Sequence, residues 1–133
     1  MASTLLLDII AFLASKNIVA GDGINAFRDF TPEEPDNLVV LHEYSGSPAS
    51  LYDACVHRSV QVVTRNLNAD MARQKAVEIF KALQEVQSTD GRIDFTSARW
   101  GQTYLRQPPF FMKRDENNRT YYTFNVGITT TIE

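Results

Sequence analysis

Cysteine is almost missing from this 133-residue sequence, in which Cys55 is the single one. One thiol can form neither an internal disulfide nor a cysteine-built zinc site, so the fold depends on its own core. A strong charge of either sign is missing too, because the formal net charge is −3. A weakly acidic chain offers no basic field for phosphates, which disfavours a DNA-coating role.

Long hydrophobic runs are also missing. The most apolar stretch, residues 5–13, contains Asp8 and is followed closely by Lys16, so it is too short to span a bilayer. It lacks the basic lead-in and small-residue cleavage site of a signal peptide, and we expect no membrane association. The spacing instead predicts an amphipathic helix over Thr4–Lys16, capped by Ser3. Its extra apolar side could contact a neighbouring subunit, although burial explains that side more simply.

The most regular pattern present is at the carboxyl end, where apolar and polar residues alternate from Thr120 to Ile132. Successive strand side chains point to opposite faces, so this pattern predicts a long strand with one buried face. A polar cluster at 115–119 precedes it, and Phe110–Lys113 comes before that cluster. Strand, turn and strand together predict a hairpin, which needs further elements to cover its apolar face.

The other segments divide into periodic stretches and breaks. Asn68 or Asp70 can cap the clearest helix, and Asn17 with the glycines that follow it ends the first one. We predict strands at 24–30, 38–44, 58–65 and 93–100 and a helix at 69–83, with a proline-acid loop at 31–36 and irregular stretches at 49–57 and 101–107.

Two helices and several alternating strands favour an α+β fold in a single domain, residues 1–133. We predict an antiparallel or mixed β-sheet with both helices packed on one face and a long C-terminal β-hairpin. The other face of the last strand is polar but uncharged. The sheet edges stay open, so they need covering or pairing with another chain.

Few residues suggest catalysis or ion binding. Cys55 and His57, with Asp53 nearby, could form a nucleophile pair. No third group that would orient this pair is evident, so structural roles are favoured. The carboxylates of Glu33 and its neighbours could bind a cation, although a solvated loop explains them better. We therefore predict no catalytic, metal or cofactor site and no enzymatic activity.

Aromatic residues gather near the carboxyl end, outside the last strand. Core packing is the default explanation for such a cluster, and a protein interface is the sharper alternative. Under the second interpretation, the candidate interface residues are Trp100, Tyr104, Phe110, Phe111 and Tyr121.

The order of elements resembles the minor capsid and tail-terminator family of long-tailed bacteriophages. Three stretches carry the resemblance, and the short leading helix also fits, so that nearly the whole chain is covered. They are the strand, proline-acid loop and strand of 27–50, the strand 60–65 with the helix 69–83, and the closing hairpin 109–132 with Arg114-Asp115-Glu116 at its turn.

This resemblance implies a structural role in the virion, at the head-tail interface, after assembly in the host cytoplasm. Family members form a ring, usually hexameric, on the tail tube, where they stop tube polymerisation and meet the head-completion protein of the connector. DNA would pass through the ring without specific binding. A head-completion or neck protein is the nearest alternative, and a small hydrolase or ligand-binding domain built on Asp53, Cys55 and His57 is a more distant one. We expect loops 17–37 and 45–57 to be mobile until assembly.

Overall fold

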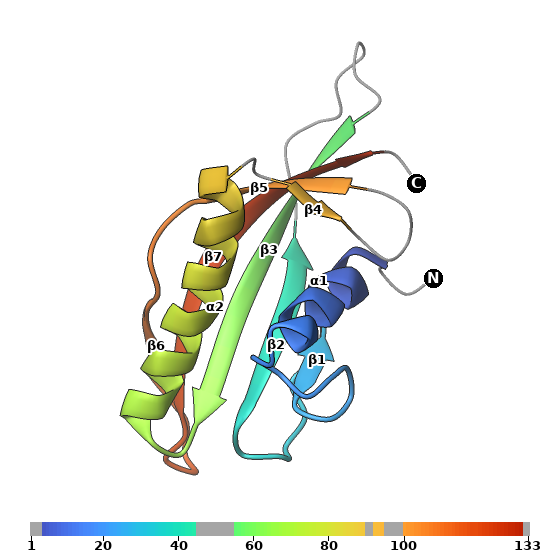
Figure 1. The fold of residues 1–133 in the computed structure, drawn as a ribbon. Coiled ribbons are helices and arrows are strands. Elements are labelled where there is room, and N and C mark those ends of the chain that lie inside the picture. The colour runs from blue at the N-terminus through green and yellow to red at the C-terminus, as the bar shows by residue number, and fades with distance from the viewer. Residues whose placement is uncertain (1–3, 45–54, 90–91, 95–99, 132–133) are drawn as a thin grey trace.

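The computed structural model describes residues 4–44, 55–89, 92–94 and 100–131 (Figure 1). Its elements follow one another in the order α1 (Thr4–Ser15), β1 (Ala26–Arg28), β2 (Leu38–Tyr44), β3 (Cys55–Asn66), α2 (Ala69–Thr89), β4 (Arg92–Asp94), β5 (Trp100–Leu105), β6 (Phe110–Arg114) and β7 (Thr120–Thr131). The fold is α+β, as predicted. Within the described residues, neither helix is long and apolar enough to cross a membrane.

The strands form one mixed sheet in the order β1-β2-β3-β7-β5-β4, and β6 pairs with β7 outside this path. β1 runs parallel to β2, and the remaining ladders are antiparallel. β7 is the central strand: β3 pairs along its whole length, while its other edge is shared between β6 and β5. The sheet does not close on itself: its strand path ends at β1 and β4, and β6 forms a further border beside β7.

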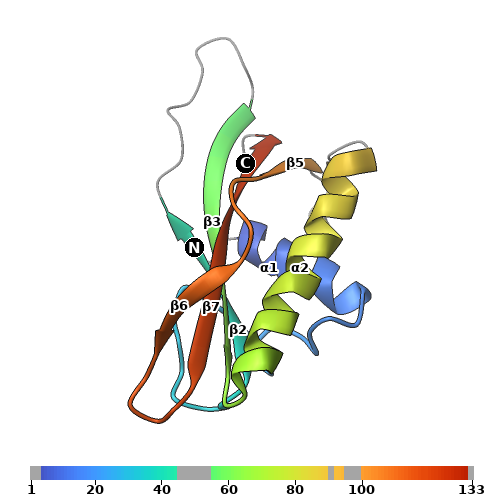
Figure 2. The same cartoon turned by 90° about the vertical axis from the view of Figure 1, so that its left-hand side faces the viewer.

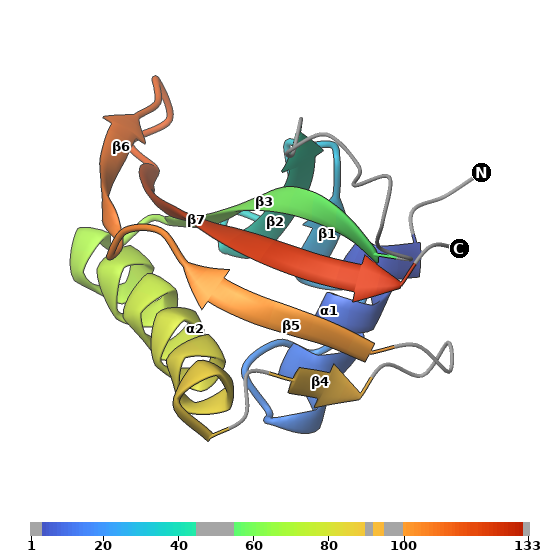
Figure 3. The same cartoon turned by 90° about the horizontal axis from the view of Figure 1, so that it is seen from above.

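Both helices cover the same face of the sheet, which confirms the predicted layering (Figure 3). The core there joins α1 to β3 and β7, and Phe124, Val126 and Ile128 of β7 are almost fully buried. These three belong to the alternating set that the sequence assigned to the core face. Phe80 of α2 packs edge-on against Phe124, with ring centroids 5.5 Å apart.

The opposite face is also partly covered, which the sequence did not indicate. A second cluster of buried residues lies there, made of Leu38, Val40, Val63 and Tyr121. Phe27 of β1 packs against this cluster. The polar face of β7 therefore does not lie open along its length.

The helix ends follow local hydrogen bonding. Asn17 takes a left-handed conformation, with φ of 60°, and its N–H donates to Ala14 O while that of Ile18 donates to Leu13 O. This is a Schellman motif, so α1 ends at Ser15 beside the predicted stop. Asn68 is the cap of α2, because its Oδ1 accepts the N–H groups two and three residues on, at 2.9 and 3.2 Å.

Two predictions of irregular stretches and one prediction of a strand were wrong. The stretch 49–57 is not irregular throughout, since β3 begins at Cys55, opposite Thr131 of β7. The stretch 101–107 contains most of β5, and 93–100 holds parts of β4 and β5 rather than one strand. In each case a distant ladder partner on β7 or β5 fixes the strand, so its own sequence need not alternate.

Candidate interaction surface

The strand β6 is exposed along all five residues, Phe110–Arg114. Phe110, Phe111 and Met112 keep 44%, 55% and 42% of their surface open to solvent. Consecutive large apolar side chains on an exposed edge strand are unusual, because they favour pairing with another chain. Phe110 and Phe111 were predicted interface candidates, and Met112 was missed because a single methionine adds little to an aromatic count.

The register of β6 against β7 sends these side chains to both faces of the sheet. Phe110 lies opposite Thr123 on the face away from the helices, and Phe111 lies opposite Tyr122 on the helix face. The Phe111 and Tyr122 rings meet edge to face, with centroids 6.0 Å apart. A register shift at Met112 interrupts the ladder, and no other described strand pairs with the outer edge of β6 (Figure 2).

Tyr121, another candidate from the sequence, lies beneath this strand rather than on its surface. It is only 7% exposed, and its ring lies near two cations, with Lys113 Nζ at 4.8 Å and Arg65 Cζ at 5.9 Å from the ring centroid. Its hydroxyl donates to Asp115 Oδ2 at 3.0 Å. Tyr121 thus supports the base of the hairpin from the second cluster.

Arg119 fixes the turn of that hairpin to the proline-acid loop. Its side chain is 5% exposed, and its Nε donates to Asp115 Oδ2 at 2.8 Å. It also donates to Glu33 O at 2.6 Å and Asp36 Oδ1 at 3.4 Å, while Asn117 Nδ2 donates to Glu33 Oε1 at 3.1 Å. Segments more than 80 residues apart in sequence are therefore joined through one guanidinium.

The charges of this cluster shift its pKa values. Burial works against ionisation of Asp115, but hydrogen bonds from Arg119, the Tyr121 hydroxyl and the Asn117 N–H together outweigh it and lower the Asp115 pKa from 3.8 to about 2. Burial likewise opposes the charge of Arg119, yet the carboxylates of Asp115 and Glu33 raise the Arg119 pKa. Both groups are ionised near neutral pH.

Arg65 holds the same loop from the sheet side. It is 2% exposed, and its guanidinium donates to the carbonyl oxygens of Glu33 at 3.1 Å, Asp36 at 3.0 Å and Pro35. A sequence pattern could not reveal this role of Arg65, because its partners are backbone groups about 30 residues away. These contacts favour an ordered loop at 33–36, whereas we expected the whole of 17–37 to be mobile.

The β1 border of the sheet is also apolar. Ile24 and Phe30 flank β1 and are 64% and 60% exposed. Phe30 packs edge-on against Phe27, with centroids 6.3 Å apart. Asp29 is exposed beside Phe30 in the chain, while Arg28 of β1 pairs with Asp22 at 2.9 Å, so this border carries charges of both signs. Lys113 and Arg114 are exposed on β6.

Trp100 and Tyr104 are placed only by their backbone. Trp100 begins β5 opposite Asp94, and Tyr104 pairs with Gly127 of β7. β5 and β6 pair with the same edge of β7, so the strands that hold these residues lie along the same edge as Phe110 and Phe111. Their side chains lie outside the described part, and their role at an interface stays a prediction.

The residues proposed for catalysis are not brought into a described site. Cys55 and His57 begin β3, where only the backbone is described, and Asp53 lies outside the described residues, as does most of loop 45–57. Glu33 and Asp36 contact Arg119 rather than each other. Among the described residues, no three histidine, cysteine or acidic side chains gather as metal ligands would.

The structure thus defines an α+β sandwich with an unclosed sheet, and its β1 and β6 borders carry exposed apolar side chains. Exposed apolar side chains on open sheet edges are typical of surfaces that contact other chains. The chain belongs to the bacteriophage tail terminator family, because the model of that family, described as bacteriophage tail terminator protein, matches residues 12–132. Comparison with curated proteins gave no match. Members of the family are structural, so the chain is a phage structural protein that acts with tail and head components.

Proposed function

We propose that the chain forms a ring, hexameric as the resemblance implies, that caps the tail tube of a long-tailed phage, stops its polymerisation and joins the tail to the head connector. The family match over residues 12–132 carries this proposal. The resulting location is the head-tail interface of the virion, reached after assembly in the host cytoplasm. DNA would pass through the ring without specific binding, which suits a net charge of −3.

The two sheet borders support a head-to-tail contact between copies. A ring needs two different surfaces on each subunit that fit one another, because an isologous contact closes as a dimer. The β6 and β1 borders are made of different residues and lie on different sides of β7 in the strand order. In the proposed ring, Phe110, Phe111 and Met112 of one subunit pack against Ile24 and Phe30 of the next.

The experiment that tests the proposal is tube assembly in the presence of the purified chain. Polymerising tube protein from the same phage is mixed with increasing amounts of the chain, and tube lengths are measured by negative-stain electron microscopy. A terminator shortens the length distribution and appears as a cap at one tube end. Unchanged tube lengths contradict this role and favour the alternative of a head-completion or neck protein, which would bind the connector instead.

A second arm tests the enzymatic alternative. Replacing Cys55 and His57 together by alanine leaves tube capping intact if the chain is structural, because neither residue belongs to the proposed contact. Loss of activity from a variant that folds with unchanged circular dichroism would favour a site built on these residues.

A further inference from the structure

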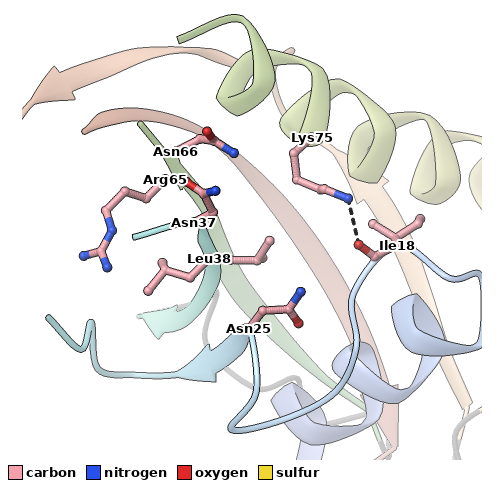
Figure 4. Close-up of a pocket in the computed structure, with 8 residues that line it drawn as sticks. Ile18, Asn25, Asn37, Leu38, Arg65, Asn66 and Lys75 are labelled. Atoms are coloured by element: carbon pink, nitrogen blue, oxygen red, sulfur yellow. Dashed lines mark hydrogen bonds between the residues drawn. The ribbon is translucent and has the colours of Figure 1, made fainter. Parts of the chain in front are cut away.

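A small pocket lies where the loop after α1, the beginning of β2 and the beginning of α2 meet (Figure 4). Its volume is about 70 Å³. Pockets for drug-sized ligands or cofactors occupy roughly 300–1,000 Å³, so this one has room for a few atoms only. It lies away from the β6 border and takes no part in the proposed ring contact.

Three asparagines, Asn25, Asn37 and Asn66, line the pocket, and the last two provide hydrogen-bond donors. Asn37 Oδ1 accepts the N–H of Leu67 at 3.1 Å, and Asn66 Oδ1 accepts the N–H of Asn68 at 2.9 Å. These bonds fix which end of each amide carries the oxygen, and they leave both NH₂ groups without an acceptor in the described part of the chain. Figure 4 shows the amide nitrogen of Asn66 on the side that faces Lys75.

Lys75 adds a positive charge to the pocket lining. Its Nζ donates to Ile18 O at 2.8 Å and to Glu78 Oε1 at 3.0 Å. An ammonium has three N–H donors, so one remains available. Glu78 is an exposed residue with 52% of its side chain open to solvent, so its pairing with Lys75 is a weak surface contact that another carboxylate can replace.

The remaining walls of the pocket are uncharged. Arg65 contributes only its stem, because its guanidinium points away and donates to loop carbonyls (Figure 4). Ile18 and Val39 supply apolar surface. The lining of the pocket therefore combines N–H donors with apolar side chains, which is the arrangement that fits a carboxylate on an aliphatic stem.

We propose that this pocket binds the carboxylate of an acidic side chain from a protein partner, with Asn37, Asn66 and Lys75 as the donors. Few atoms fit, and a ligand of four heavy atoms is limited to roughly 1.5 kcal/mol per atom, so a free metabolite would bind weakly. A glutamate anchored in a partner has less freedom to lose on binding. The inference is independent of the ring contact, because none of the three donors, Asn37, Asn66 and Lys75, belongs to either sheet border.

The test uses two side-chain analogues that differ in one charge. N-acetyl-glutamate amide and N-acetyl-glutamine amide are titrated into the ¹⁵N-labelled full chain at constant ionic strength, and the side-chain NH₂ signals of Asn37 and Asn66 are followed by NMR. We expect saturable shifts with the glutamate compound and none with its neutral counterpart. Equal shifts with both, or linear shifts without saturation, overturn the proposal. Acetate binding as tightly as the glutamate compound also overturns the assignment to a side chain.

Matched variants locate the effect. Asn66→Asp keeps the oxygen that accepts the Asn68 N–H but replaces the donor with a negative oxygen, so the fold is retained while the site is lost. We expect binding at least about tenfold weaker, since a charge-assisted hydrogen bond contributes about 1.5–3 kcal/mol. Asn118→Asp makes the same charge change in the hairpin turn and should leave binding unchanged. Equal weakening by both variants shows a general charge effect and contradicts the site.

Discussion

Arg119 and Asp115 form an ion pair across the hairpin turn, with Arg119 Nε 2.8 Å from Asp115 Oδ2. The same carboxylate accepts the Tyr121 hydroxyl, and its Oδ1 accepts the Arg119 and Asn117 N–H groups. One side chain therefore closes the turn, orients a buried tyrosine and neutralises a buried guanidinium. The proline-acid loop depends on this pair as well, because Arg119 also donates to Glu33.

Asp115→Asn should destabilise the chain at pH 7 and make its stability less dependent on acid. The Asp115 pKa is lowered in the folded state to about 2 from 3.8, so between these values the unfolded chain binds more protons. Wild-type stability from this group is therefore complete above about pH 4 and is lost as the pH falls towards 2. The free energy of unfolding is measured in urea at pH 2, 3, 4 and 7. The difference in this free energy between wild type and variant should become smaller as the pH falls.

The control for this series is Glu116→Gln, which removes an exposed carboxylate from the same turn. Its unfolding free energy should follow that of the wild type at each pH. A constant gap between Asp115→Asn and wild type down to pH 2 would contradict the assigned role of Asp115.

Two threonines of β7 allow a matched test of buried hydroxyls. Thr120 Oγ1 is buried and has no hydrogen-bond partner among the described residues, whereas Thr123 Oγ1 donates to Val62 O at 2.9 Å. Valine has the same shape, so Thr123→Val should cost about 1 kcal/mol, while Thr120→Val should be neutral or stabilise by up to about 1 kcal/mol. Urea unfolding of both variants decides this. Equal losses would mean that Thr120 does make a bond in solution.

The sequence predicted those parts of the fold that depend on local patterns. Alternation in β7 identified Phe124 and Ile128 as core residues, and the candidate caps Asn68 and Asp70 indicated the start of α2, because strand period and capping chemistry are local. The roles of Arg65 and Arg119 could not be predicted. Their partners are loop carbonyls far along the chain, and a sequence pattern treats an arginine as a surface residue unless the partner is known.

The sequence indicated only some residues of the candidate surface, again because it shows local patterns and not distant pairing. Aromatic density identified Phe110 and Phe111, which are exposed on β6, but it also selected Tyr121, which the register places beneath Lys113. The density of aromatic residues along the chain does not show on which face of a strand pair each side chain lies. The contribution of Met112 depends on β6 being a border strand, which only the pairing of β7 with both β5 and β6 determines.

Arg65→Lys should loosen the proline-acid loop. Lysine keeps the charge but lacks the planar fork that reaches the carbonyls of Glu33, Pro35 and Asp36, so we expect a loss of about 2 kcal/mol in unfolding free energy. ¹⁵N relaxation should give order parameters near roughly 0.85 for this loop in the wild type and lower values in the variant. A loop that is already mobile in the wild type would support the original expectation from its composition.

Border variants test the head-to-tail contact. Met112→Glu damages the β6 border and Ile24→Glu damages the β1 border, so each alone should remain monomeric. Mixed together they should form a dimer of about 30 kDa, twice the chain's 15.0 kDa, because each supplies the intact border that the other lacks. Met71→Glu, which changes an equally exposed methionine at the start of α2, is the control and should assemble as the wild type does. Failure of the mixture to dimerise would contradict the pairing of these two borders.

Native mass spectrometry of the wild-type chain, alone and with tube protein, tests most directly whether it works by ring assembly. The proposed hexamer predicts a species of about 90 kDa, six times the 15.0 kDa chain, in at least one of the two samples. A chain that stays at 15.0 kDa at high concentration and in the presence of tube protein would contradict ring assembly.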